Sequence, residues 1–486
     1  MHLIGVDIGT QGTKASLFTA SGELVSEAFE ASNLISRVPG EVEQDPGEIY
    51  GSVLRTIREV AAKAGVRTVD AIAIDGQMSG IMGIDEDWNA VTPYDSWLDT
   101  RCERYIELMK SSSQEDIIRI CGGPPTYDHG PKMLWWMHER PEVFGRIHKF
   151  VLPSAYAAGR LAGLRGSDAF MDYTFLHFTC FADVEKKCWS ERTAHAFGFD
   201  TAKLPRIVNP WDIIGHLAPE AAQQCGLISG IPIAAGCGDQ PATSLGAGIT
   251  RVGQAFDGAG TASVFSCALA EYKPDAENKT VFYARSVIDN LWIPLAYTNG
   301  SGLCLKWFAE GFTSLSLSEL DEESSRAEAG SGGLIFIPHF AGRVCPNNPK
   351  VKGSWIGLTF SHSREHLYRS IMEAIAYECA IYKRILNTSI DEVRVIGGGA
   401  KSSVFNQIKA DVLGVRHSTL AKSGGTTYGS AVIAGYSVGM YNSIAEEIDR
   451  NVAVKDSFEP DASNAAVYER CKELYEKYLG FFDLFS

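Results

Sequence analysis

The sequence lacks several features that would place it in a common functional class. It has no excess of basic residues, because Lys and Arg number 44 against 59 Asp and Glu, for a net charge of −15. Non-specific nucleic-acid binding needs a basic surface, so we expect no nucleic-acid partner. No run of about 18 apolar residues occurs, so we also expect no membrane span and no membrane partner.

The cysteines do not indicate a secreted, disulfide-bonded protein either. The 11 cysteines are odd in number and scattered, and no CxxC pair occurs. This usage fits a reduced protein better than a disulfide framework. The first residues, MHLIGVDIGT, have no cationic segment and reach Asp7 early, so we expect no signal peptide. Together these features predict a cytoplasmic location.

Two common nucleotide-binding motifs are missing, but two other glycine-rich turns are present. There is no Gly-Lys-Ser/Thr of a Walker loop and no GxGxxG fingerprint. Asp7–Thr13 reads DIGTQGT and Asp257–Ser263 reads DGAGTAS. Free backbone N–H groups and hydroxyls in such turns can hold phosphate oxygens. The alternative is an ordinary hairpin, because Gly and Thr are normal turn residues.

A single carboxylate stands at the end of an apolar strand in the stretch Ile233–Ala247. The strand ends in Gly236-Cys237-Gly238, and Asp239 follows before a helix of small residues. A carboxylate ringed by glycines approaches a substrate closely and, when buried without a formal partner, can accept a proton. The alternative is that Asp239 caps the helix that follows it.

The order of predicted elements indicates an α/β protein with mixed sheets. Strands over 3–6, 14–19 and 23–28 form a meander, and a helix capped by Asp45 and a strand over 69–74 follow. A second meander begins after residue 253, which suggests a duplicated domain. We therefore predict two domains, residues 1–248 and residues 249–486. In the second domain, a strand over 392–396 leads through Gly397-Gly398-Gly399-Ala400 into a helix over 403–413, which allows close approach of a flat or anionic ligand.

The loop from Tyr94 to Arg101 is both polar and aromatic. Sugars are often held by aromatic rings and hydrogen-bonding carboxylates, so this loop is one candidate wall of a sugar site. The alternative is a loop closed by an ion pair between Asp99 and Arg101.

Taken together, these stretches resemble the FGGY family of carbohydrate kinases. The similar stretches are Ile4–Thr10, Glu43–Pro46 (EQDP), Gly236–Asp239, Asp257–Thr261, Gly397–Ala400, and Gly353–Leu358 followed after seven residues by His366–Glu373. The resemblance implies two ribonuclease-H-like domains of the actin-like ATPase fold, with a cleft between them. It implies ATP and Mg²⁺ as cofactors and transfer of a phosphoryl group to a primary hydroxyl of a small sugar or polyol.

The resemblance also implies a role for particular residues. Asp239 would be the general base, and Asp7 and Asp239 would be outer or occasional ligands of a Mg²⁺ held largely by water and phosphate oxygens. Lys14 would be either a phosphate partner or a solvated charge. The implied phosphate-binding residues are Thr10, Gly12, Thr13, Gly260 and Thr261, and the implied adenosine-binding residues are Gly302, Gly398, Gly399, Ala400 and Ser403.

The implied sugar site comprises Gln77, Met78, Ser79, Asp99 and Tyr127, together with Asp239. Met78 would be an apolar platform or, alternatively, a core methionine. Gly76-Gln77-Met78 and Lys132–Trp135 are similar to the xylulokinases of the family, which makes a ketopentose such as xylulose the expected acceptor. Xylulokinases usually have His where this chain has Ser79, so another ketose or a polyol is the alternative acceptor.

Two other functions share part of the same pattern. An actin-like nucleotide switch has the phosphate turns but needs no acceptor base. A sugar-binding pseudokinase would have damaged chemistry, whereas Asp7, Asp239 and both turns are present here. Because family members are often dimers, the resemblance also implies a homodimer.

Overall fold

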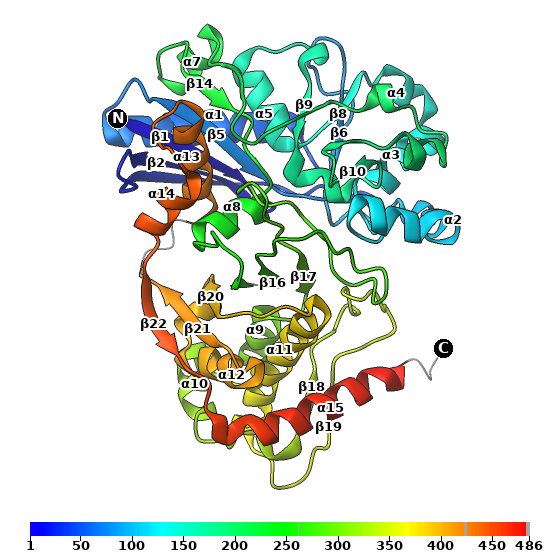
Figure 1. The fold of residues 1–486 in the computed structure, drawn as a ribbon, viewed down its shortest axis with the longest axis vertical. Helices are drawn as coiled ribbons and strands as arrows, with labels where there is room; N and C mark the ends of the chain where they lie inside the picture. Colours follow the sequence, from blue (N-terminus) through cyan, green and yellow to red (C-terminus); the bar gives the residue numbers. More distant parts are fainter. Residues whose placement is uncertain (261, 422–424, 483–486) are drawn as a thin grey trace.

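Two mixed sheets form the two halves of the molecule (Figure 1). The structure is a computed structural model that describes residues 1–260, 262–421 and 425–482. Each sheet has six strands, ordered β13-β14-β5-β1-β2-β3 in the first and β17-β16-β15-β20-β21-β22 in the second. This arrangement is the predicted pair of α/β domains.

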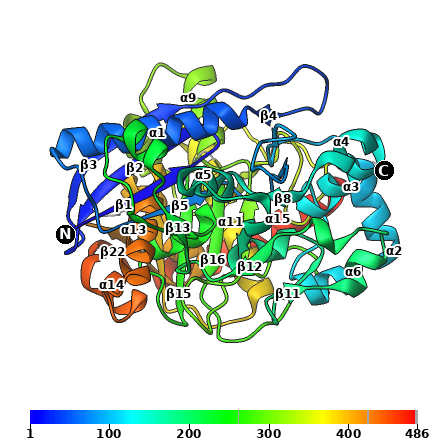
Figure 2. The same cartoon turned by 90° about the horizontal axis from the view of Figure 1, so that it is seen from above.

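The first sheet is built from the N-terminal half of the chain. Its strands are β1 (His2–Ile8), β2 (Gly12–Thr19), β3 (Leu24–Ala31), β5 (Ala71–Gly76), β14 (Pro232–Ala234) and β13 (Ile213–His216). β5 is buried along its whole length, as expected for a central strand with both faces covered. One face is covered by α1 (Pro46–Ala64) and the other by α13 (Gly425–Ser437), which lie on opposite sides of β1 and β2 in Figure 2.

The second sheet repeats the topology of the first. Its strands are β15 (Gln254–Ala259), β16 (Ser263–Cys267), β17 (Leu295–Thr298), β20 (Glu392–Ile396), β21 (Arg416–Leu420) and β22 (Val454–Phe458). β15, β16 and β17 pair antiparallel in sequence, as β1, β2 and β3 do, and β15 pairs parallel with β20 as β1 does with β5. The structure thus confirms the predicted duplication at the level of topology.

Helix boundaries follow local signals in the sequence. At the start of α1, the Asp45 side chain accepts the N–H of Glu48 at 2.9 Å and Pro46 occupies the first turn, as predicted. The other helices are α2 (Glu103–Cys121), α3 (His129–Glu139), α4 (Pro141–Arg146), α5 (Pro153–Ala162), α6 (Glu191–His195), α7 (Pro219–Cys225), α8 (Asp239–Gly246), α9 (Gly302–Phe312), α10 (Leu317–Ser324), α11 (Arg364–Leu386), α12 (Ser403–Leu413), α14 (Ile444–Asn451) and α15 (Ala465–Phe481).

Short strand pairs complete the described fold outside the two large sheets. They pair β4 (Glu43–Gln44) with β7 (Tyr94–Asp95), β6 (Met82–Ile84) with β8 (Lys149–Val151), β9 (Phe170–Asp172) with β12 (Arg206–Val208), β10 (Ala182–Asp183) with β11 (Cys188–Trp189), and β18 (Ile335–Ile337) with β19 (Ser354–Ile356). The β4–β7 pair brings the EQDP segment beside the Tyr94–Arg101 loop.

One helix of the second half packs on the first sheet. α13, orange in Figure 1, contacts β1, β5 and α8. It lies so close to β1 that a Cβ atom added at Gly5 would stand 1.9 Å from the carbonyl oxygen of Thr427. The predicted domains 1–248 and 249–486 therefore share this helix. Among the helices of the described ranges, none is long and apolar enough to cross a membrane.

Candidate active site

Three carboxylates meet where strands of the first sheet end. β1 and β5 run parallel with Asp7 paired to Asp75, and Gly76 forms a bridge with Gly238, which brings the next residue, Asp239, alongside. Asp239 is the first residue of α8, whereas Gly238 occupies the cap position and no side chain caps the helix. The alternative that Asp239 is a helix cap is therefore wrong.

Each of these carboxylates keeps one oxygen without a partner in the described structure. Within the described residues, Asp7 Oδ1, Asp75 Oδ1 and Asp239 Oδ1 are buried and have no hydrogen-bond partner. Thr426 donates to Asp7 Oδ2 at 2.8 Å, and Ser430 donates to Asp75 Oδ2 at 2.5 Å. Both hydroxyls come from α13, so this helix holds the two strand carboxylates in place.

Burial dominates the electrostatics of the cluster. Burial, and then the charge of Asp7, raises the pKa of Asp239 to about 7. Burial also raises the pKa of Asp7, against the lowering effect of the Thr426 hydroxyl, and raises the pKa of Asp75 well above its usual range, with the Asp7 charge as the next cause. Neighbouring carboxylates in a buried site do not all ionise together. The cluster therefore has unused acceptor capacity for a proton or a cation.

A buried hydroxyl supports the turn that carries Asp239. Gly238 donates its backbone N–H to Thr174 Oγ1 at 3.0 Å, and Thr174 Oγ1 donates to Asp172 Oδ1 at 2.5 Å. Asp172 also accepts the backbone N–H of Thr174 at 2.9 Å. Sequence reasoning missed this support, because Thr174 and Gly238 lie 64 positions apart.

The predicted sugar-site residues Gln77 and Met78 lie beside the same turn. A Cβ atom added at Gly238 would stand 2.6 Å from Met78 Sδ, so the methionine covers the turn directly. Gln77 donates to Gln44 Oε1 at 2.6 Å and accepts the Thr10 hydroxyl at 3.3 Å. The EQDP segment is thus joined through Gln77 to the glycine-rich turn Asp7–Thr13, the first predicted phosphate turn.

Ser79 faces a carboxylate that the prediction left out. Ser79 has a φ of 63°, a left-handed conformation that is uncommon for residues other than glycine and often marks functional sites. Asp128 is buried, with Oδ2 unpartnered among the described residues. Burial raises the Asp128 pKa to about 7, although the hydroxyls of Thr126 and Ser79 lower it. Tyr127 precedes Asp128, is half-buried, and accepts a hydrogen bond at its carbonyl from Lys132.

Asp99 is part of an ion-pair network instead of an open wall. Arg101 Nε donates to Asp99 Oδ2 at 2.8 Å, and Val42 N–H donates to the same oxygen at 2.9 Å. Arg101 also lies 2.9 Å from Glu43 Oε1 and 2.9 Å from Asp95 Oδ1. The structure shows the ion-pair alternative for this loop, and the binding of sugar hydroxyls by Asp99 stays a prediction.

Not all side chains predicted to bind phosphate at the first glycine-rich turn point to that turn. Thr13 is buried in β2 and shares a hydrogen bond of 2.7 Å with Ser52 of α1, so its hydroxyl does not reach the turn, contrary to the prediction. Lys14 is half-exposed and lies 2.8 Å from Glu27, which favours the solvated-charge alternative. Gly12 begins β2, and Thr10 accepts a hydrogen bond from Trp97 Nε1 at 2.8 Å in addition to donating to Gln77.

A cavity of about 730 Å³ lies beside the second glycine turn. The predicted residues Gly260, Gly302, Gly398 and Gly399 line it, and Gly302 N–H donates to Gly260 O at 3.1 Å. Ala400 and Ser403 are not among the lining residues, whereas Ser402, which caps α12, is one of them. Thr261 lies outside the described residues. The remaining lining residues are Ala259, Ser301, Leu305, Lys306, Leu317, Ser318, Asp321, Tyr368, Lys401, Ser402 and Phe405.

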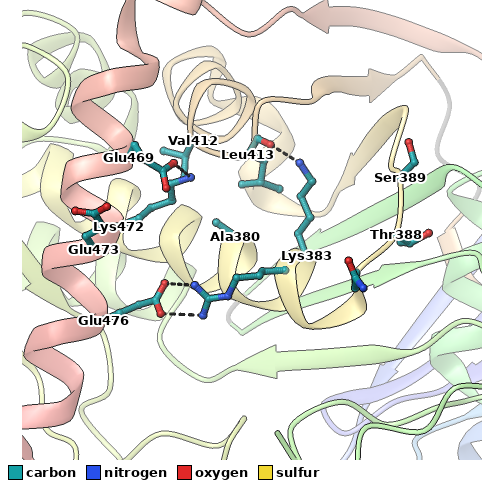
Figure 3. A pocket seen from close by; sticks show the side chains of 12 residues that line it. Ala380, Lys383, Thr388, Ser389, Val412, Leu413, Glu469, Lys472, Glu473 and Glu476 are labelled. Atoms are coloured by element: carbon teal, nitrogen blue, oxygen red, sulfur yellow. Dashed lines mark hydrogen bonds and ion pairs between the residues drawn. The ribbon is translucent and has the colours of Figure 1, made fainter. Parts of the chain in front are cut away.

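A second cavity of about 730 Å³ lies between α11, α12 and α15 (Figure 3). Its charged side chains bind neighbouring groups of the protein: Lys383 donates to the Leu413 carbonyl at 2.7 Å, and Arg384 pairs with Glu476 at 2.6 Å. It contains none of the predicted site residues. We therefore place the chemistry at Asp239 and not in this cavity.

The fold resembles that of several solved sugar kinases. The crystal structure of ligand-bound xylulose kinase from Lactobacillus acidophilus matches 100% of this chain and 100% of its own, with a TM-score of 0.94 at 22% identity. This likeness shows the fold, which fits the predicted pair of ribonuclease-H-like, actin-like domains.

Sequence comparison gives the family. Residues 2–246 match the N-terminal domain, and residues 259–438 the C-terminal domain, of the FGGY family of carbohydrate kinases. The chain belongs to this family. Xylulose kinase from Bacillus subtilis (strain 168) is 27% identical over 483 residues, 98% of this chain and 96% of its own. Gluconokinase from the same organism is 26% identical over 429 residues, 85% of this chain and 82% of its own.

Proposed function

We propose that this carbohydrate kinase transfers a phosphoryl group from ATP to a primary hydroxyl of a small neutral sugar or polyol, with a ketopentose such as xylulose as the expected acceptor. The observation that carries the proposal is Asp239, whose buried Oδ1 has no partner in the described structure. Its pKa of about 7 suits a group that accepts a proton near neutral pH. The xylulose kinase of B. subtilis, similar along the whole chain, supports the choice of acceptor.

In this reaction Asp239 takes the proton of the acceptor hydroxyl while the oxygen of that hydroxyl attacks the γ-phosphorus of ATP in line. Phosphoryl transfer depends mostly on positioning and charge neutralisation, so the base contributes a moderate factor, on the order of 10²–10⁴. Met78 and Gln77 hold the acceptor beside Asp239, and Ser79 and Asp128 face its hydroxyls. The turn from Gly9 to Gly12 offers backbone N–H groups to the phosphates.

The donor set at the carboxylate cluster fits Mg²⁺. Mg²⁺ prefers oxygen ligands and keeps several waters when bound to nucleotides. Asp7 Oδ1 and Asp239 Oδ1 are unpartnered carboxylate oxygens, yet no group of three His, Cys, Asp or Glu in the described residues forms a preformed metal cage. Asp7 and Asp239 would hold the ion through few protein contacts, and the ion would neutralise phosphate charge.

The charge of the site favours a neutral acceptor over a sugar acid such as gluconate. Asp128 and Asp239 form no ion pair within the described residues, although the charge of Lys132 lowers the pKa of Asp128, and the Arg101 guanidinium is bound by Glu43, Asp95 and Asp99. A carboxylate on the acceptor would meet like charge in a buried site. Gluconate phosphorylation is nevertheless the second candidate, because the similarity to gluconokinase covers most of this chain.

The test is ADP release from Mg-ATP by the full-length protein with a panel of pentuloses, hexuloses, pentitols, tetritols, glycerol and gluconate. Phosphorus NMR of the product identifies the phosphorylated hydroxyl. We expect one neutral acceptor to stimulate ADP release and to yield a phosphate ester of a primary hydroxyl. Stimulation by gluconate alone would contradict the neutral-acceptor proposal. ATP hydrolysis that no acceptor stimulates would instead favour the nucleotide switch.

The homodimer implied by the resemblance stays a prediction.

A further inference from the structure

One wall of the cavity beside the second glycine turn carries a carboxylate that the proposed reaction does not use. Asp321 projects from α10 into a cavity otherwise lined largely by glycines and apolar side chains, including Leu305, Leu317 and Phe405. Burial raises the pKa of Asp321. Asp321 is half-buried, and moving a carboxylate partly out of water costs free energy unless hydrogen bonds compensate for it, so its position at the cavity points to a ligand.

The hydrogen bonds of Asp321 leave acceptor capacity unused. Tyr368 donates its hydroxyl to Asp321 Oδ1 at 3.2 Å, and the Ser402 hydroxyl lowers the Asp321 pKa from its side of the cavity. No Lys, Arg or His of the described residues lies within ion-pair distance of Asp321, although Lys306 and Lys401 line the same cavity. A carboxylate accepts about four hydrogen bonds, so two hydroxyl donors do not satisfy it.

The type of ligand group that Asp321 can bind follows from this chemistry. A carboxylate repels phosphate oxygens and accepts N–H and O–H groups. The other side of the cavity is lined by Gly260, Gly302, Gly398 and Gly399 and carries no carboxylate of the described residues, and glycine-rich turns of this kind suit phosphates. The two parts of the cavity therefore differ in kind, and Asp321 belongs to the part that suits a group with N–H or O–H donors.

We propose that Asp321 is a nucleotide-specificity residue, whose carboxylate accepts a hydrogen bond from an N–H or O–H donor of the nucleoside: the exocyclic amino group of adenine or a ribose hydroxyl. This inference rests on the proposed ATP-dependent reaction, and it assigns a role in that reaction to a residue outside the glycine turns. A site built to hydrogen-bond a donor discriminates strongly against analogues that lack it.

The experiment compares ATP, ITP, 2′-deoxy-ATP and 3′-deoxy-ATP as phosphoryl donors for the wild type and Asp321→Asn. Glu322→Gln is the matched control, because Glu322 is an exposed carboxylate on the same helix that does not line the cavity. Asparagine keeps the size and the oxygen that Tyr368 contacts, and a thermal melt checks folding. Calorimetric binding of adenosine alone provides a readout independent of turnover.

We expect Asp321→Asn to raise the KM for ATP and weaken adenosine binding by about tenfold, with little change in kcat or in the KM for the sugar. In the wild type, either ITP or one deoxy analogue should have a KM about tenfold above that of ATP. This difference from ATP should be smaller in Asp321→Asn. An ITP effect identifies the adenine amino group, and a deoxy effect identifies the ribose hydroxyl. Glu322→Gln should behave as the wild type.

Equal use of all four nucleotides by the wild type, together with an unchanged ATP KM and unchanged adenosine binding in Asp321→Asn, would overturn the inference. Failure of the proposed function gives a different pattern. If no acceptor is phosphorylated but adenosine binding weakens in Asp321→Asn and not in Glu322→Gln, the kinase proposal falls and the role of Asp321 stands.

Discussion

Thr174 accepts the backbone N–H of Gly238 at 3.0 Å, and this single hydroxyl joins the segment after β9 to the turn that positions Asp239. The same hydroxyl donates to Asp172, so it is satisfied on both sides within a buried region. Positioning a reacting group by this means is valuable because small displacements of a catalytic base reduce the rate of transfer.

Thr174→Val should therefore affect both folding and catalysis. It leaves the Gly238 N–H without a partner and removes the hydroxyl bond to Asp172, which keeps only the backbone N–H of residue 174; the change costs about 1–3 kcal/mol of unfolding free energy. We expect kcat to fall about tenfold with the KM for ATP unchanged, because the turn and not the nucleotide cavity loses its support. Thr174→Ser, which keeps the hydroxyl, is the control. Equal kcat values for the Val and Ser variants would refute a positioning role.

Asp172 should make stability depend on pH. Burial raises its pKa from 3.8 to about 7, so the folded protein favours the protonated form. The stability that the folded protein gains from the raised Asp172 pKa is fully present below about pH 4 and is lost as the pH rises to about 7. Relative to Asp172→Asn, which does not titrate, the wild type should lose about 2.5 kcal/mol of unfolding free energy between pH 5 and pH 8. Urea unfolding of both proteins at several pH values measures this, and a pH-independent difference would contradict it.

A buried ion pair lies beneath the second glycine turn. Lys409 of α12 pairs with Asp257 of β15, both nearly inaccessible to solvent, and Ser263 donates to Asp257 Oδ1 at 2.8 Å. Lys409→Met leaves an uncompensated buried carboxylate and should cost about 3–5 kcal/mol of unfolding free energy. Combining it with Asp257→Leu should restore most of that loss. A thermodynamic cycle from denaturant unfolding tests this pair, and additive losses in the double variant would show that the two charges are not coupled.

The sequence predicts those parts of the fold that depend on local signals. The meanders and the cap of α1 follow from alternation and from the Asp-Pro pair near each element. The apolar strand predicted to end in Gly236-Cys237-Gly238 is shorter in the structure, because β14 ends at Ala234 and Gly236 turns the chain with a φ of 75°. The burial of Thr13 could also have been predicted from the local pattern. Thr13 shares one face of its strand with Ala15 and Leu17, and all three are buried.

The partners of the site residues were not predictable in the same way. Thr426 reaches Asp7 across 419 positions, and Ser430 reaches Asp75 across 355, because α13 returns to the first sheet from the second half of the chain. Asp321 lacks any sequence motif and becomes notable only when α10, α11 and α12 bring it to the cavity. Such contacts depend on tertiary packing, which a single sequence does not specify through local pattern.

The most direct test of the central claim is the rate of phosphoryl transfer by Asp239→Asn with the best neutral acceptor. We expect kcat to fall on the order of 10²–10⁴-fold while the KM values for ATP and the acceptor change little, because Asn keeps the shape but cannot accept the proton. Asp289→Asn, at an exposed aspartate, should keep wild-type activity. Near-wild-type kcat in Asp239→Asn would contradict the assignment of the general base.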